Sequence, residues 1–196
     1  MFKITKMPVL VIGAPRTGTT VLSEWILKKN PEITQSFFDP TIPKFKDRYE
    51  KFISYANNNS NKDYLVKANG INYIEFPSWF REKIIAKEVF IIKNQRLNVE
   101  KQIASYFIAQ SRKTWYYNKK NLDKFNDSVI AIDTELLDYS IKNVFGDNEI
   151  VKEIPADISV IYENIQDNIT EDTYCIKTPL PSNYQEILNI IKTRIS

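Results

Sequence analysis

Two patterns of apolar residues alternate along the chain. Unbroken apolar runs are typical of strands buried on both faces of a parallel sheet, whereas apolar residues spaced three or four positions apart are typical of helices. The runs predict strands at Met7–Gly13, Tyr64–Lys67, Glu88–Lys93 and Asp157–Tyr162. The wider spacing predicts helices at Thr19–Lys29, Lys46–Ala56, Pro77–Ala86, Asn98–Thr114, Thr134–Ile154 and Asn183–Ile195.

Other segments lack either pattern. Glu32–Pro43, which contains the aromatic pair Phe37-Phe38, is predicted to be a loop, and Asn118–Asp127 is predicted to be a charged linker. Gly146 leaves open whether the helix predicted at Thr134–Ile154 is unbroken, because glycine costs about 1 kcal/mol relative to alanine inside a helix. No repeat or interdomain linker is apparent, so we expect a single domain over residues 1–196.

The first predicted strand runs into the loop Gly13-Ala-Pro-Arg-Thr-Gly-Thr-Thr20, and a predicted helix follows directly. The chain has four glycines, and two of them, Gly13 and Gly18, lie in this loop. A buried strand, a glycine-bearing loop and a helix start form a cradle of backbone N–H groups that suits phosphate-like anions. The pattern therefore predicts a P-loop-type three-layer α/β/α fold with a mostly parallel central sheet.

In such sheets, ligands bind at the carboxyl ends of the strands. We therefore expect Gly13–Thr20, the residues after Lys67 and the residues after Lys93 to face one crevice.

The amino-acid composition limits which ligands and which catalytic groups the protein can use. The sequence is 43% hydrophobic and 26% charged, as in ordinary globular proteins, and its net charge of +3 suits an anionic ligand without indicating nucleic-acid binding. There is no histidine, so a general base must be a carboxylate, a lysine, a tyrosine or water, and zinc sites of the Cys/His kind are excluded. Cys175 is the single cysteine, there is no long apolar segment, and Met1–Met7 is too short and polar for a signal peptide. We expect a cytoplasmic protein without a membrane partner.

The loop has the spacing of a nucleotide-binding P-loop, but Thr19 stands where the lysine of an NTPase reaches the β- and γ-phosphates. This difference argues against ATP or GTP hydrolysis, as does the lack of a clear acidic magnesium ligand after an apolar strand. The cation of the loop is instead Arg16, whose planar guanidinium suits tetrahedral oxyanions.

GAPRTGTT resembles the 5′-phosphosulfate loop of sulfotransferases, which reads close to G-x-P-R-[ST]-G-T-T. A second segment adds to the resemblance, because Arg96 follows a predicted strand and Ser105 lies on the next predicted helix. The run from Gln102 to Ala109, followed by Trp115, looks most like the bacterial trehalose 2-sulfotransferase type. Weaker likenesses are the pair Tyr162-Glu163 at the end of a late strand, for which a structural role is the better explanation, and the segment from Lys177 to Tyr184.

The resemblance implies 3′-phosphoadenosine 5′-phosphosulfate as donor, 3′,5′-ADP as product and no metal. It implies that Arg16 and the backbone N–H groups of residues 17–20 stabilise charge on the leaving group. It further implies binding of the 5′-phosphate by the hydroxyls of Thr19 and Thr20, and of the 3′-phosphate by Arg96 and Ser105. The implied nucleotide-binding residues are Pro15, Arg16, Thr17, Gly18, Thr19, Thr20, Arg96, Ser105 and Lys177.

The general base is where the chain departs from the family. The bacterial type has a glutamate followed by aromatic residues in the loop after the first helix, but this chain reads Gln35-Ser-Phe-Phe-Asp39. Asp39 is our candidate base, because burial beside the aromatic pair would raise its pKa into a useful range. Asp39-Pro40 is equally well explained as a simple turn.

The resemblance thus implies transfer of a sulfuryl group to the hydroxyl of a carbohydrate or small-molecule acceptor. Aromatic residues could line the acceptor pocket, although most aromatic residues belong to cores; they are Phe37, Phe38, Trp79, Trp115 and Tyr116. Two alternatives stay open: a P-loop nucleotide or small-molecule kinase, and a non-catalytic nucleotide-binding or assembly protein.

Overall fold

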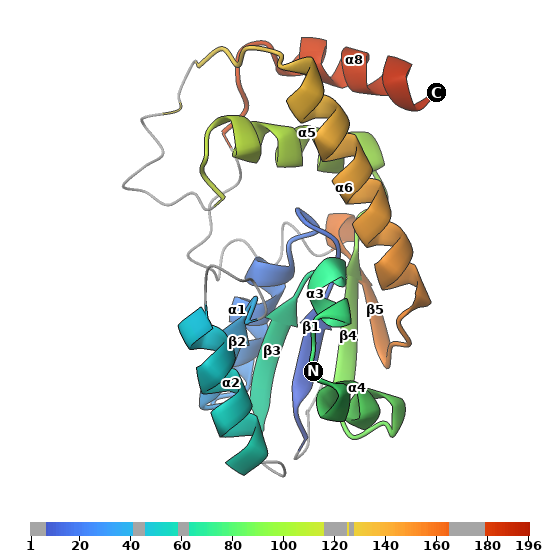
Figure 1. The fold of residues 1–196 in the computed structure, drawn as a ribbon. Coiled ribbons are helices and arrows are strands. Elements are labelled where there is room, and N and C mark those ends of the chain that lie inside the picture. Colours follow the sequence, from blue (N-terminus) through green and yellow to red (C-terminus); the bar gives the residue numbers. More distant parts are fainter. Residues whose placement is uncertain (1–6, 41–45, 59–62, 116–124, 126–127, 165–178) are drawn as a thin grey trace.

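A five-stranded parallel sheet organises the protein (Figure 1). The computed structural model describes residues 7–40, 46–58, 63–115, 125, 128–164 and 179–196. The strand order is β2-β3-β1-β4-β5, and every neighbouring pair is parallel. The strands are β1 (Val9–Ile12), β2 (Gln35–Phe38), β3 (Tyr64–Ala68), β4 (Phe90–Gln95) and β5 (Ile158–Ile161).

Helices follow the strands along the chain, as expected of parallel connections. They are α1 (Thr19–Lys29), α2 (Lys46–Asn58), α3 (Gly70–Ile74), α4 (Ser78–Ile85), α5 (Val99–Ser111), α6 (Thr134–Glu153) and α8 (Tyr184–Ile195). Among the described residues, no helix is both long enough and apolar enough to cross a membrane.

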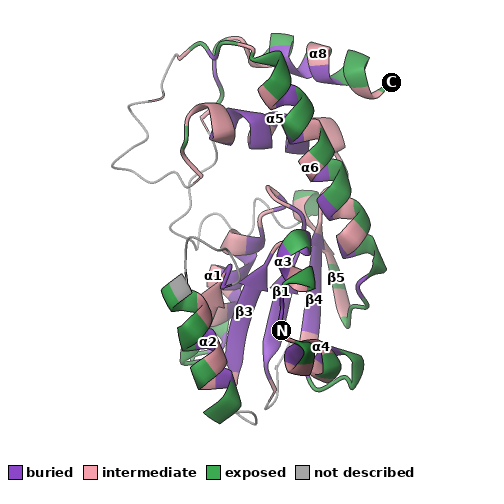
Figure 2. Cartoon of the chain, in the orientation of Figure 1, coloured by how far each residue is buried: buried purple, intermediate pink, exposed green. Residues whose placement is uncertain are grey.

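Both faces of the sheet are buried, and the alternation along β1 shows why. Leu10 and Ile12 pack into a cluster with residues of α2, α4 and the end of α6, whereas Val9 and Val11 pack into a cluster with residues of α1. The central strands are accordingly buried along their length (Figure 2). The predicted α/β fold, with helices on both faces of a parallel sheet, is therefore confirmed.

A third apolar cluster joins α5, α6 and α8 and includes Ile103, Phe107, Leu137, Val144 and Ile191. These helices lie beyond the carboxyl ends of the strands, and α6 extends from them down to the sheet, where Val151 and Ile154 join the first cluster (Figure 1). The carboxyl edge of the sheet thus faces a layer of helices, and the loop after β1 lies between the two.

One local prediction is wrong, one short helix was not predicted, and one question that the sequence left open is answered. The segment predicted as a loop, Glu32–Pro43, contains β2, because Gln35–Phe38 pairs in register with Tyr64–Lys67. The short helix α3 was not predicted. The helix α6 runs unbroken through Gly146, around which there is open space.

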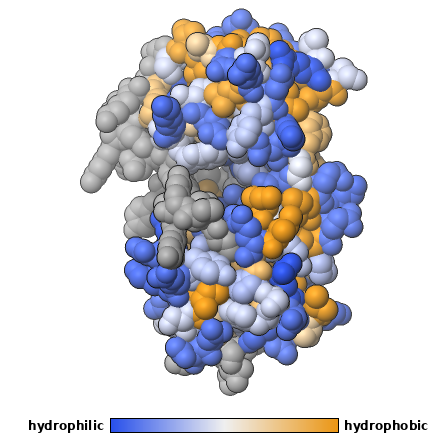
Figure 3. Space-filling view, viewed as in Figure 1, coloured by the Kyte–Doolittle hydropathy of each residue, from blue (hydrophilic) through white to orange (hydrophobic). Residues whose placement is uncertain are grey.

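The outer surface mixes polar and apolar residues (Figure 3). Apolar residues gather near the middle of the face shown in Figure 3, where Figure 1 places α3 and α6. Ile71 and Ile74 of α3 are both about half exposed.

Candidate functional site

The loop between β1 and α1 requires glycine at both ends. A Cβ on Gly13 would lie 2.4 Å from the carbonyl oxygen of Asn94 and 2.5 Å from the hydroxyl of Thr17. Gly18 has a φ of +80°, and a Cβ there would lie 2.5 Å from the ring of Tyr162. The glycines therefore allow the loop to pack tightly against β4 on one side and against the residue after β5 on the other.

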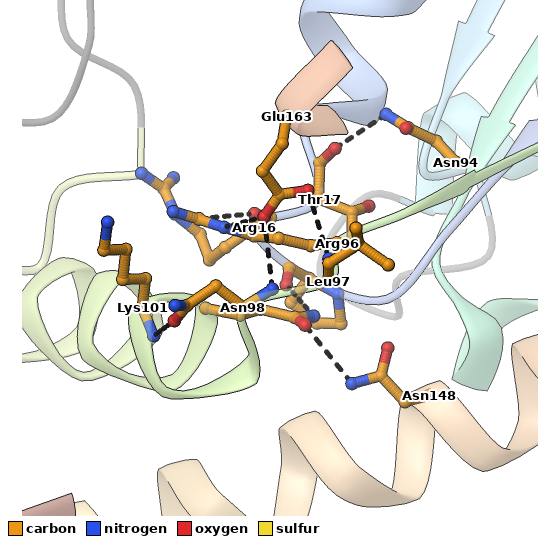
Figure 4. Close-up of polar contacts among 11 residues, drawn as sticks. Arg16, Thr17, Asn94, Arg96, Leu97, Asn98, Lys101, Asn148 and Glu163 are labelled. Atoms are coloured by element: carbon orange, nitrogen blue, oxygen red, sulfur yellow. Dashed lines mark hydrogen bonds and ion pairs between the residues drawn. The ribbon is translucent and has the colours of Figure 1, made fainter. Parts of the chain in front are cut away.

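Side chains from β4, from the turn after it and from α5 hold the middle of the loop (Figure 4). Gln102 Nε2 donates to the carbonyl oxygen of Pro15 at 2.9 Å, and Arg96 Nη1 donates to that of Arg16 at 3.1 Å. Asn94 Nδ2 donates to the carbonyl oxygen of Thr17 at 2.6 Å. Three consecutive carbonyl groups of the loop are therefore hydrogen-bonded to side chains that are distant in sequence.

The start of α1 has the electrostatics of an anion site. Leu22 N–H donates to the carbonyl oxygen of Gly18, so the N–H groups of Thr19, Thr20 and Val21 precede the first helical hydrogen bond. The first turn has no acidic residue, and the last turn contains Lys28 and Lys29. The helix dipole therefore favours an anion at this end.

Arg16 joins the loop to α5. Its backbone has a φ of 66°, its Nε donates to Ser105 Oγ at 2.9 Å, and its Nη1 donates to the carbonyl oxygen of Trp115 at 2.8 Å. Arg16 and Ser105 are 89 positions apart, and the sequence predicted both as ligands of one nucleotide. The structure brings these two predicted residues into direct contact.

Arg96 is the second cation at the loop. Its guanidinium lies 5.1 Å from the ring centroid of Tyr162, and its Nε lies 3.7 Å from Glu163 Oε1. Burial lowers the pKa of Arg96, and this effect outweighs the opposing influence of Tyr162, Glu163 and Tyr184. The pKa of Tyr184 is raised by burial, which outweighs the opposing effect of Arg96.

Glu163 connects Arg96 to the start of α5 (Figure 4). Its two carboxylate oxygens accept the N–H groups of Leu97 at 3.1 Å and Asn98 at 3.2 Å. Burial alone would raise the pKa of Glu163, but the net change is downward because backbone N–H groups and Arg96 favour the carboxylate. The pair Tyr162-Glu163 therefore packs on the loop and holds the turn between β4 and α5.

A second group of charged side chains lies at the carboxyl ends of β2 and β3. Lys67 Nζ donates to both oxygens of Asp39 at 2.8 Å, and the two side chains are only 5% and 8% exposed. Asp39 has a φ of 49° and directly follows β2. The candidate base is therefore engaged in a buried ion pair, a contact that the sequence did not suggest.

Asp147 of α6 belongs to the same region. Its Oδ1 accepts the N–H of Ile71 in α3, and its residue is 7% exposed. Burial raises the pKa of Asp147 to about 6 from an ordinary value of 3.8, although the hydrogen bond from Ile71 and the charge of Lys67 oppose the shift. Tyr106 of α5 also interacts electrostatically with Asp147. In the described part of the chain, no three Asp, Glu or Cys side chains gather as metal ligands would.

The remaining predicted residues have varied surroundings. Thr17 is fully buried, and its hydroxyl donates to the carbonyl oxygen of Ala14 at 2.8 Å. Thr19 is buried, and Thr20 is half-buried. Lys177 lies outside the described residues.

The three strand ends that we expected to face one crevice lie side by side at one edge of the sheet. Ile12 is in register with Ala68 of β3 and with Lys93 of β4, and Gly13 N–H donates to the carbonyl oxygen of Ala68 at 3.4 Å. The loop therefore lies beside the ends of both neighbouring strands.

The aromatic residues proposed for an acceptor pocket belong mainly to cores. The ring of Phe37 packs against Phe52, Tyr55 and Tyr64, and that of Trp79 stacks on Phe52. Trp115 packs edge-to-face on Tyr106 at 5.2 Å. Tyr116 lies outside the described residues.

Asn94, Gln102 and Asn148 are the residues of this site to which the sequence assigned no function. A polar residue that ends an apolar run, as Asn94 does, is a usable signal in a parallel sheet. Asn148 gives no such signal, because it lies on an amphipathic helix among other polar residues.

Comparison of the sequence with models of protein families finds no matching family. Comparison with curated proteins finds no significant match either.

Proposed function

We propose that the protein is a sulfotransferase that moves a sulfuryl group from 3′-phosphoadenosine 5′-phosphosulfate to an acceptor hydroxyl. The observation that carries the proposal is the convergence of Arg16, Arg96 and Ser105 beside the N-terminus of α1. Two cations, a hydroxyl and a helix start within one network suit a ligand with two separate anionic groups.

The two ends of the network suit different parts of this donor. The N–H groups at the start of α1 would bind the 5′-phosphosulfate, and Arg96 with Ser105 would bind the 3′-phosphate. Ser105 Oγ accepts the Nε–H of Arg16, and a hydroxyl that accepts a hydrogen bond retains its own proton to donate. Ser105 can therefore donate to a phosphate oxygen without losing Arg16.

In the proposed reaction, the acceptor oxygen forms a bond to sulfur while the bond between sulfur and the bridging phosphate oxygen breaks. The electron pair stays on the phosphate, where the N–H groups of the loop and Arg16 would stabilise it, and the proton of the acceptor hydroxyl passes to a base. Preorganised donors of this kind contribute roughly 3–4 kcal/mol each in other enzymes. Asp39 is our proposed base, and Lys67 donates to both of its carboxylate oxygens.

Ligand-dependent thermal stability tests the donor side. A ligand that binds only the folded protein raises its melting temperature, so 3′,5′-ADP should stabilise the protein more than 5′-AMP does. Stabilisation by ATP with magnesium but not by 3′,5′-ADP would instead indicate a kinase. Stabilisation by none of these ligands would favour a non-catalytic protein.

Ser105→Ala tests the 3′-phosphate directly. We expect its affinity for 3′,5′-ADP to fall about tenfold and its affinity for 5′-AMP to stay near wild type, because a hydrogen bond to a charged group is lost. The matched control is Ser111→Ala on the same helix, whose hydroxyl donates to the carbonyl oxygen of Phe107 at 2.9 Å. Equal losses for both nucleotides would contradict the assignment of Ser105 to the 3′-phosphate.

A further inference from the structure

Every carbonyl oxygen from Ala14 to Gly18 has a hydrogen-bond donor. Ala14 accepts from the N–H of Thr17 at 3.3 Å and from its hydroxyl at 2.8 Å, and Gly18 accepts from the N–H of Leu22 at 3.0 Å. The three carbonyl groups between them accept from Gln102, Arg96 and Asn94. The negative ends of five consecutive peptide dipoles are thus directed at donors of the protein.

This arrangement matters for anion binding. A carbonyl oxygen directed at an anion repels it, whereas backbone N–H groups and a helix start attract it. Because each of these carbonyl groups already has a donor within the protein, the donors at the start of α1 can face an anion without competing oxygens. We propose that Gln102, oriented by Asn148, is a positioning residue that holds the loop in its anion-binding form; this inference rests on the proposed function and extends it to α6.

Gln102 suits this role because its amide has no freedom to turn. The residue is fully buried, its Nε2 donates to Pro15, and its Oε1 accepts Asn148 Nδ2 at 3.3 Å. An amide has a donor end and an acceptor end, so Asn148 fixes which end faces the loop. A residue of α6 that acts through Gln102 thereby determines whether Pro15 has a donor.

Asn94 donates a hydrogen bond to this loop although its position reduces the stability of the fold. It is fully buried, and its Nδ2 donates to the carbonyl oxygen of Thr17. Its Oδ1 is buried and has no hydrogen-bond partner among the described residues. A buried unsatisfied oxygen destabilises the fold, so an apolar residue would serve stability better than an amide that serves only the loop.

The test measures anion binding by the full-length protein with calorimetry, using inorganic pyrophosphate and 3′,5′-ADP as probes. Gln102→Met keeps the size of the side chain but removes the donor, and we expect both affinities to fall about three- to tenfold. The control is Gln110→Met on the same helix, whose amide donates to Tyr106 at 3.2 Å. Measurements are made well below each melting temperature, so that a purely structural role would leave the affinities unchanged.

A second variant, Asn148→Asp, changes the loop indirectly, through Gln102. Asn148→Asp replaces the amide that donates to Gln102 by a carboxylate, which favours the turned amide and directs its oxygen at the carbonyl of Pro15. We expect a loss of pyrophosphate affinity at least as large as that of Gln102→Met. Asn143→Asp on the same helix carries the same change of charge, and its amide donates to the carbonyl oxygen of Tyr139.

The outcomes separate this inference from the proposed function. If the wild type binds pyrophosphate but not 3′,5′-ADP, the proposed function is wrong, and the pyrophosphate affinities of the variants still decide the inference. If Gln102→Met and Asn148→Asp bind both probes as their controls do, the inference is wrong and the proposed function stands. If the wild type binds neither probe, both are overturned.

Discussion

Removing either charge of the Asp39–Lys67 pair should destabilise the protein strongly. Both side chains are more than nine-tenths buried, and Lys67 donates to both carboxylate oxygens at 2.8 Å. Breaking such a pair from one side costs about 3–5 kcal/mol, because the remaining charge stays buried without its partner. For a domain of this size that corresponds to a fall in melting temperature of about 6–20 °C.

The test is a double-mutant cycle of Asp39→Asn and Lys67→Met, in which urea unfolding measures the free energy of unfolding of each variant. Asn is chosen because position 39 has a positive φ, which Asn tolerates. We expect each single variant to lose about 3–5 kcal/mol and the double variant to lose much less than the sum. The control pair is Glu149 and Lys152, which lie 3.9 Å apart, are mostly exposed and should contribute about 1 kcal/mol or less.

The same variants decide whether Asp39 is the base. If the role of Asp39 is limited to its ion pair with Lys67, the sulfotransferase activity lost in Asp39→Asn should return in the double variant, because neither charge of the pair remains. If Asp39 takes the proton of the acceptor, the double variant should remain inactive, with the affinity for 3′,5′-ADP near wild type. A single-variant cost below about 1 kcal/mol, or strict additivity, would refute the view of this pair as a buried, mutually neutralising unit.

Two further predictions concern stability. Burial raises the pKa of Asp147 from 3.8 to about 6, so the folded protein holds this proton more tightly than the unfolded chain does. Protonated Asp147 therefore stabilises the fold at low pH. This contribution to the free energy of unfolding, about 3 kcal/mol, is lost as pH rises through 6. Asp147→Asn, which retains an acceptor for Ile71, should therefore flatten the profile of unfolding free energy between pH 4 and 8, and an unchanged profile would contradict the cause given. Gly18→Ala should lower the melting temperature, because φ is +80° and the added Cβ meets Tyr162, whereas Gly146→Ala in open space should raise the unfolding free energy by about 0.5–1 kcal/mol. Equal melting temperatures for these two variants would show that the ring does not constrain the loop.

The sequence by itself determined the elements whose pattern is local. The run Val9–Ile12 is apolar throughout because both faces of its strand are covered, and α1 begins and ends where its apolar spacing predicts. The strand β2 escaped prediction because Gln35–Phe38 is a partly exposed edge strand that lacks such a run. Its conformation depends on pairing with β3, and pairing between distant segments leaves little trace in local sequence.

For the site, the sequence identified the loop, and only the tertiary structure decided what surrounds it. Glycines and a helix start are contiguous signals, whereas the contact between Arg16 and Ser105 spans 89 positions and depends on the position of α5 beyond the carboxyl edge of the sheet (Figure 1). The ion pair of Asp39 with Lys67 likewise arises because neighbouring parallel strands end at one edge. The partner of a buried carboxylate is a side chain that the fold brings next to it. The residues adjacent to the carboxylate in sequence do not specify which side chain that is.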